Sequence, residues 1–234
     1  MNAVRRGLLV GIAGLSLAVG APAQDGPAEI TQGFRAYIVA EPRFPAEDVR
    51  NRTGKLQDLV TDYGLNPTVA VFSRTIPTDA HHPLAAVVHK LDDLTSDDGW
   101  KDRRLGAYLV FLALKDEFRK DDSRDARIKE ISQFVSGVMP KRVTVGLAEA
   151  TEMPQAQPLV PAQVTAMGIA PEDDVVIVFY DKFHVIKRWK FKAGMPPGEG
   201  DVAAIEAEVA KHLGPRKKKS EEPKKQEEPK AAKK

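Results

Sequence analysis

The residues of this 234-residue sequence that could do chemistry are histidines and carboxylates in two separate loops. They are Asp79, His81 and His82 in the first loop and Glu172, Asp173 and Asp174 in the second. Imidazole nitrogens and carboxylate oxygens are ligands of divalent metal ions such as Zn²⁺. The same groups could serve as acid and base in a hydrolytic enzyme. Because their spacing matches no metal motif, a third reading stays open, in which they are solvated residues that cap a helix and a turn.

The sequence contains no cysteine. A thiolate is the reactive species in thiol–disulfide exchange and in thiol peroxidases, so both activities are excluded. Disulfides are excluded as well, and the stability of the fold must come from its hydrophobic core.

The first 23 residues have the pattern of a secretory signal peptide. Arg5 and Arg6 precede an apolar run over residues 7–20, and Ala21-Pro22-Ala23 supplies small residues for cleavage after Ala23. The apolar run is shorter than the roughly 20 residues that a membrane-spanning helix needs. We therefore expect export, with a mature protein that is periplasmic or extracellular and carries no transmembrane segment.

The other end of the chain, residues 214–234, is rich in Lys, Glu and Pro. It has too few apolar residues to offset the entropy of ordering, so we expect a disordered tail. Its residues 216–234 hold nine basic and four acidic side chains, so the tail is also a candidate for binding polyanions. The body, 24–213, holds 29 acidic and 24 basic residues, a balance that disfavours nucleic acid as a partner of the domain.

Hydrophobic patterning predicts an α/β domain over residues 24–213. Continuous or alternating apolar runs predict strands at 34–40, 67–72, 105–114, 143–148, 174–180 and 184–191. Helical spacing of apolar residues predicts helices at 54–63, 83–94, 126–138 and 201–213, with a short helical turn at 164–169 and a loop at 152–161. The alternation predicts a central mixed sheet with helices on both faces, closed by a C-terminal β-hairpin plus helix.

This order of elements over residues 66–213, with Gly168-Ile169 ahead of a strand, resembles the thioredoxin-like superfamily. The similarity is to its exported thiol–disulfide oxidoreductase and peroxiredoxin-like branch. The resemblance implies a redox site at the start of the 83–94 helix, facing a cis-proline directly before the central strand. It also implies that the two loops of the histidine–carboxylate cluster face each other.

Both halves of that redox site are missing. The loop at 75–82 has no cysteine, and Asp173-Asp174 stands where the resemblance implies the proline. A second resemblance, to a planctomycete-type exported group, runs through 52–55 and 63–72 and places a lost Cys-x-x-Cys at Asp58 and Thr61.

We therefore predict an exported, redox-inactive thioredoxin-like domain that acts as a binding or structural module in the cell envelope. Its partner is expected to be an envelope protein or a polyanion. The alternatives are a metal-binding protein or hydrolytic enzyme that uses the histidine–carboxylate cluster, and a polyanion-binding protein that acts through the tail.

Overall fold

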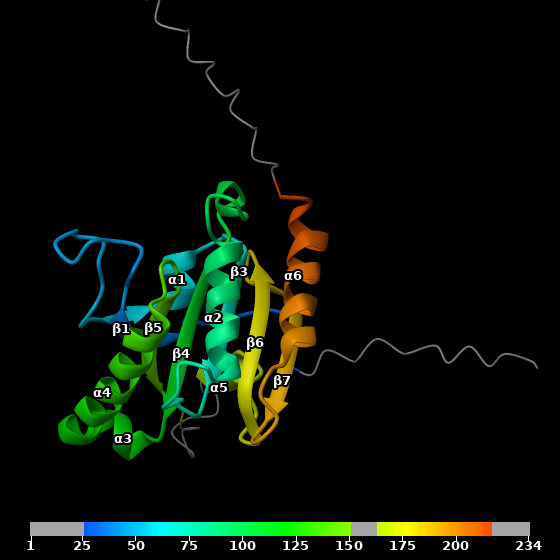
Figure 1. The fold of residues 1–234 in the computed structure, drawn as a ribbon. Helices are drawn as coiled ribbons and strands as arrows, with labels where there is room; N and C mark the ends of the chain where they lie inside the picture. Colours follow the sequence, from blue (N-terminus) through cyan, green and yellow to red (C-terminus); the bar gives the residue numbers. More distant parts are fainter. Residues whose placement is uncertain (1–25, 151–162, 217–234) are drawn as a thin grey trace, which may run out of the picture.

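The computed structural model describes residues 26–150 and 163–216, which form one seven-stranded sheet (Figure 1). The strand order is β2-β1-β5-β4-β3-β6-β7. Strands β3, β4 and β5 run parallel, and every other pair is antiparallel. The strands are β1 (Arg35–Ala40), β2 (Leu56–Asp58), β3 (Thr68–Ser73), β4 (Gly106–Ala113), β5 (Thr144–Glu149), β6 (Asp173–Asp181) and β7 (His184–Lys192).

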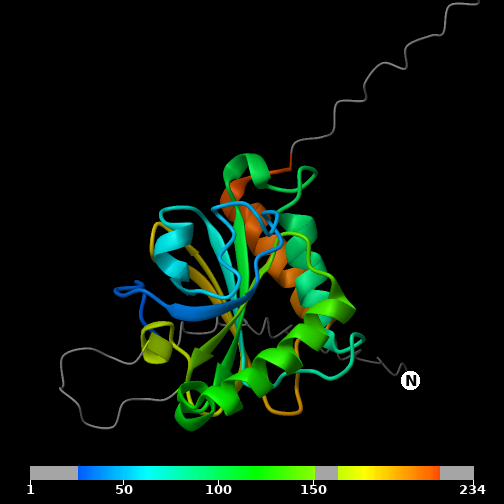
Figure 2. The ribbon, with the colours of Figure 1, turned by 90° about the vertical axis from the view of Figure 1, so that its left-hand side faces the viewer.

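Helices cover both faces of this sheet (Figures 1 and 2). One face packs against α2, α4 and α6, and the other packs against α1, α5 and the segment that precedes β1. The helices are α1 (Leu59–Tyr63), α2 (Pro83–Leu94), α3 (Lys115–Arg119), α4 (Asp121–Val138), α5 (Gln163–Ala166) and α6 (Glu199–Leu213), with a 3-10 helix η1 (Lys101–Arg103). Within the described ranges, no helix is both long enough and apolar enough to cross a bilayer.

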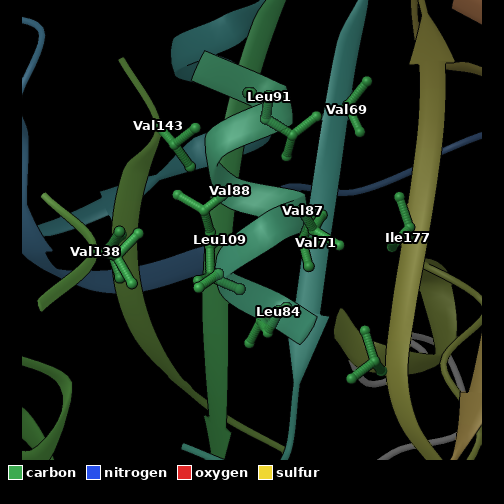
Figure 3. Packing of buried hydrophobic residues seen from close by; sticks show 14 of the residues in the cluster. Val69, Val71, Leu84, Val87, Val88, Leu91, Leu109, Val138, Val143 and Ile177 are labelled. Atoms are coloured by element: carbon green, nitrogen blue, oxygen red, sulfur yellow. The ribbon is translucent and has the colours of Figure 1, made fainter. Parts of the chain in front are cut away.

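The core is built on β3, whose six residues are all buried. Buried strands of a parallel sheet read as continuous apolar runs because both of their faces are covered. On one face, α2 lays four aliphatic side chains against the sheet, and these are Leu84, Val87, Val88 and Leu91 (Figure 3). Each such side chain contributes roughly 1.5–3 kcal/mol when fully buried. This packing holds the start of α2 beside the end of β3.

The order β3-α2-β4, then β6, β7 and α6, is the arrangement that the thioredoxin-like resemblance predicts, and the fold prediction is confirmed. Strand β5 adds a third parallel strand beside β4, and β1 with β2 extends the same edge. The predicted C-terminal hairpin is formed by β6, which lies inside the sheet, and β7, which lies at its edge. Predicted and observed ends of the other elements differ by a few residues, the largest shift being the start of α4 at Asp121.

One predicted helix is partly wrong. The apolar spacing over 54–63 predicts a helix, but residues 56–58 form β2, and only residues 59–63 are helical. The physical reason is tertiary, because Leu56 and Gln57 pair with Tyr37 and Ala36 of β1. The helix can begin only where Asp58 caps its first turn.

Three predicted features lie outside the described residues: the signal peptide, the loop at 152–161 and most of the tail. The described chain continues past α6 as far as Arg216. Trp100 Nε1 donates to the carbonyl of Gly214 at 2.9 Å, and the Arg216 guanidinium lies 4.7 Å from the Trp100 ring centroid. Chain packed on the domain therefore reaches beyond residue 213, the boundary that composition alone predicts.

Candidate binding face at the start of helix α2

The two loops of the histidine–carboxylate cluster meet at the end of β3. Ser73 pairs with Val175 in the sheet, so the chain leaving β3 runs beside the chain entering β6. Arg74 Nε donates to the carbonyl of Asp173 at 2.8 Å, and Thr75 Oγ1 donates to Asp174 Oδ1 at 2.8 Å. Contact between the loops is thus made by Arg74 and Thr75, two residues that belong to no motif in the sequence.

In the first loop, the predicted site residues form local caps. Asp79 Oδ1 accepts a hydrogen bond from the backbone N–H of His81 at 2.8 Å. His82 is the N-cap of α2, and its Nδ1 accepts from the N–H of Leu84 at 3.2 Å. Pro83 follows at the first helical position, where its missing N–H leaves no bond unmade. The imidazole of His82 therefore caps the start of α2, where the thioredoxin-like resemblance implies a thiolate.

In the second loop, the carboxylates are also engaged locally. Asp173 is buried, accepts from the N–H of Ala170 at 2.9 Å, and lies 3.5 Å from Lys190 Nζ. Glu172 is exposed to solvent. Across the described residues, no three His, Asp or Glu side chains are grouped so that they could hold a metal ion. The arrangement is that of helix and turn caps.

The positions matched to a lost Cys-x-x-Cys lie elsewhere, at the start of α1. Asp58 Oδ1 accepts from the N–H of Phe34 at 3.0 Å and from the N–H of Thr61 at 3.2 Å, and its Oδ2 accepts from Thr61 Oγ1 at 2.9 Å. One carboxylate thus caps α1 and ties it to the segment that precedes β1. Asp58 and Thr61 form a structural contact with each other.

Gly168 of the Gly-Ile pair has a conformational role. Its φ is +74°, and a Cβ at this position would lie 2.8 Å from Nε of Arg188. Arg188 is itself buried and donates to the carbonyls of Met167 and Pro27. A glycine is required here because it allows both the left-handed backbone and the passage of the arginine.

A groove between α2 and α6 begins near the start of α2, at the end of the sheet where β3 leads into that helix. The sequence did not predict this groove. Its volume is about 450 Å³. Its lining is mostly apolar, with charged side chains at the rim, and consists of Pro83, Ala86, Lys90, Pro197, Gly198, Glu199, Val202, Ala203 and Glu206. A salt bridge of 3.0 Å between Lys90 Nζ and Glu206 Oε2 joins the two helices. Two small exposed residues, Ala86 and Ala203, leave the space between the helices open.

No protein-family model matches the sequence, and no curated protein matches it. Solved structures are similar at the level of the fold. A secreted disulfide oxidoreductase of Mycobacterium tuberculosis, homologous to E. coli DsbE, is 12% identical with a TM-score of 0.43, over 76% of this chain and 96% of that one. The exposed lipoprotein thioredoxin Etrx1 of Streptococcus pneumoniae is 13% identical with a TM-score of 0.44, over 76% and 98%. The AhpC protein of Mycobacterium tuberculosis is 9% identical with a TM-score of 0.45, over 81% and 91%.

These structures are thioredoxin-like and peroxiredoxin-like proteins. The chain described here has a thioredoxin-like α/β fold and no cysteine.

Proposed function

We propose that this chain is an exported, redox-inactive thioredoxin-like module that binds an extended peptide segment of a cell-envelope protein in the groove between α2 and α6. The observation that carries the proposal is the open apolar groove beside a helix start that holds a histidine cap and no thiol. Export is proposed from the signal-peptide pattern of residues 1–23.

The lining of the groove favours a peptide as the occupant. Apolar contacts come from Pro83, Ala86 and Val202, which suit one aliphatic or aromatic side chain. The rim carries one cation, Lys90, and two anions, Glu199 and Glu206. Mixed charge of this kind complements the polar backbone of a peptide better than it complements a polyanion or an anionic lipid. The volume falls within the range of small binding sites in proteins.

A matched pair of substitutions on α6 tests the groove. Ala203 lines it, whereas the next residue, Ala204, is also exposed and does not. Both sites are in the interior of the same helix, so Ala203→Glu and Ala204→Glu carry the same helix-propensity cost. We expect the unmodified chain and Ala204→Glu to enrich the same apolar peptides from a displayed random peptide library. Ala203→Glu should weaken binding of those peptides about tenfold, which corresponds to about 1.4 kcal/mol.

Failure to enrich any peptide, or equal losses in the two variants, would overturn the binding proposal. The redox-inactive part is tested separately by an insulin reduction assay with dithiothreitol. We expect the rate with the protein to equal the rate without it, because no thiolate is available.

A further inference from the structure

A second recess lies at the opposite end of the sheet, where the three parallel strands begin. Thr68 of β3 pairs with Gly106 of β4, and Tyr108 of β4 pairs with Thr144 of β5, so the strand starts share one end. The recess has a volume of about 160 Å³. It is separate from the groove between α2 and α6, and the two share no lining residue.

Four cationic side chains from three segments of the chain line this recess. They are Arg43 after β1, Lys101 and Arg104 at η1, and Arg142 before β5. Asp62 is the one acidic side chain among the lining residues. Such an excess of positive charge in a small recess attracts anions.

The charge of these cations is only partly neutralised. Arg43 forms two hydrogen bonds, of 2.7 and 2.8 Å, to the carboxylate of Glu41. Lys101 and Arg142 share one partner, the exposed carboxylate of Asp97, at 2.5 and 3.3 Å. Arg104 has no ion pair with any described residue. The exposed carboxylate of Asp97 is therefore shared by two cations, and Arg104 forms no ion pair among the residues that the structure describes.

Long-range contacts fix the floor of the recess. The Arg43 guanidinium lies 4.6 Å from the centroid of the Tyr63 ring. The Tyr63 hydroxyl donates to the carbonyl of Ala107 at 2.7 Å and lies 3.0 Å from Thr144 Oγ1. Thr144 Oγ1 in turn contacts both oxygens of buried Glu41 at 3.2 Å. Arg43 is thereby held in place before any ligand arrives, which lowers the entropy lost on binding.

We propose that this recess binds a small multivalent oxyanion, held by Arg43, Arg104 and the two cations that share Asp97. Guanidinium groups present parallel N–H donors that match the oxygens of phosphate and carboxylate groups. The two classes of ligand that carry such oxygens are phosphate groups and short polycarboxylates. Asp62 opposes the ligand and limits its affinity.

Titration calorimetry of the full chain at low ionic strength tests the site, with inorganic phosphate and citrate as separate probes. We expect saturable one-to-one binding of at least one probe. Binding of phosphate alone assigns the site to phosphate groups, and binding of citrate alone assigns it to carboxylates. No saturable binding of either probe overturns the proposal.

Three substitutions separate the recess from a general attraction to basic surfaces. Arg104 lines the recess, and its exposed neighbour Arg103 does not. Arg104→Gln should weaken binding about tenfold, the effect of losing one charge-assisted hydrogen bond, whereas Arg103→Gln should change it less than twofold. Asp62→Asn should strengthen binding about threefold, because it removes the one opposing charge. Equal effects at positions 103 and 104, or no gain with Asp62→Asn, would contradict the site, and structural damage cannot mimic that gain.

Discussion

The two ends of the parallel strands are built differently. At the end where β3 leads into α2, the side chains of Asp79 and His82 bond to backbone only two residues away. At the other end, Tyr63 bonds to a carbonyl 44 residues away, and Glu41 bonds to a side chain 103 residues away. At the first end, long-range bonds from Arg74 and Thr75 join the two loops, but the predicted site residues Asp79 and His82 serve only their own turns. At the other end, side chains that line the recess, such as Tyr63, are themselves part of the long-range network.

Because of this difference, the two ends should differ in how readily their residues can be replaced. Local caps can be exchanged for other residues without disturbing the sheet, so the chemistry at the start of α2 can change while the fold persists. A buried long-range network fixes side chains in advance and is expensive to disrupt. A site that depends on fixed charges therefore suits the start of the strands, whereas an adaptable peptide groove suits the α2 edge.

The largest effect is expected from alkaline pH, which should destabilise the buried network at the start of the parallel strands. Burial raises the pKa of Tyr63, raises that of Tyr108 well above its usual range, and raises that of Tyr180 to about 12. In the unfolded chain these hydroxyls ionise near pH 10. Above that pH the unfolded state loses protons that the folded state keeps, so the free energy of unfolding falls as pH rises. Three groups together give a slope of up to about 4 kcal/mol per pH unit.

Urea unfolding between pH 8 and 11.5, with tyrosine absorbance at 295 nm, measures this slope. Lysines also titrate in that range, so Tyr63→Phe serves as the control. Removal of one hydroxyl should make the slope shallower by about 1.4 kcal/mol per pH unit. Identical slopes in the two proteins would show that Tyr63 does not titrate differently on folding.

Removal of the Glu41 carboxylate should have the next largest effect. Its side chain is 2% exposed, and it pairs with Arg43 and contacts Thr144. Glu41→Ala leaves the half-buried guanidinium without its partner, at a cost of about 3 kcal/mol in unfolding free energy. Glu41→Gln keeps an oxygen for hydrogen bonding and should lose less. Equilibrium urea unfolding at pH 7 measures both, and a loss below about 1 kcal/mol for Glu41→Ala would contradict a buried structural pair.

The same distinction explains what the sequence could predict. Strand β3 was predictable because it is a continuous apolar run, and helix α2 was predictable because residues such as Leu84 and Leu91 recur at helical spacing. Strand β2 was missed because its pairing with β1 is a tertiary contact. The resemblance implied that the two loops face each other, and helix and turn capping was one of the readings that the sequence left open. Which backbone N–H each side chain accepts from depends on the folded turns, as for Asp79 and His82.

Neither recess could be found from sequence spacing. The groove depends on the spacing between α2 and α6. Small residues such as Ala86 and Ala203 leave room for a groove, but they do not determine that spacing. The cations around the second recess, such as Arg43 and Arg142, stand far apart in the chain. Only the common start of β3, β4 and β5 brings them together. A run of like charges would have been a signal, but the cations of this recess come from separate segments and form no such run.

The smallest effect is expected from removal of the cap on α2. His82→Ala removes the acceptor for the N–H of Leu84, and the loss of such a cap costs about 0.5–1 kcal/mol. His81→Ala is the matched control, because His81 joins its turn through its backbone N–H and is exposed, so we expect almost no change.

Thermal unfolding of the unmodified chain and of these two variants, with and without added Zn²⁺, tests whether the same histidines bind a metal ion. Because neither imidazole belongs to a group of three possible ligands within residues 26–150 and 163–216, Zn²⁺ should leave the melting temperature of the unmodified chain unchanged. A Zn²⁺-dependent rise that disappears in both histidine variants would instead make this edge a metal site, and the contrast between the two ends would then be one of two functional sites.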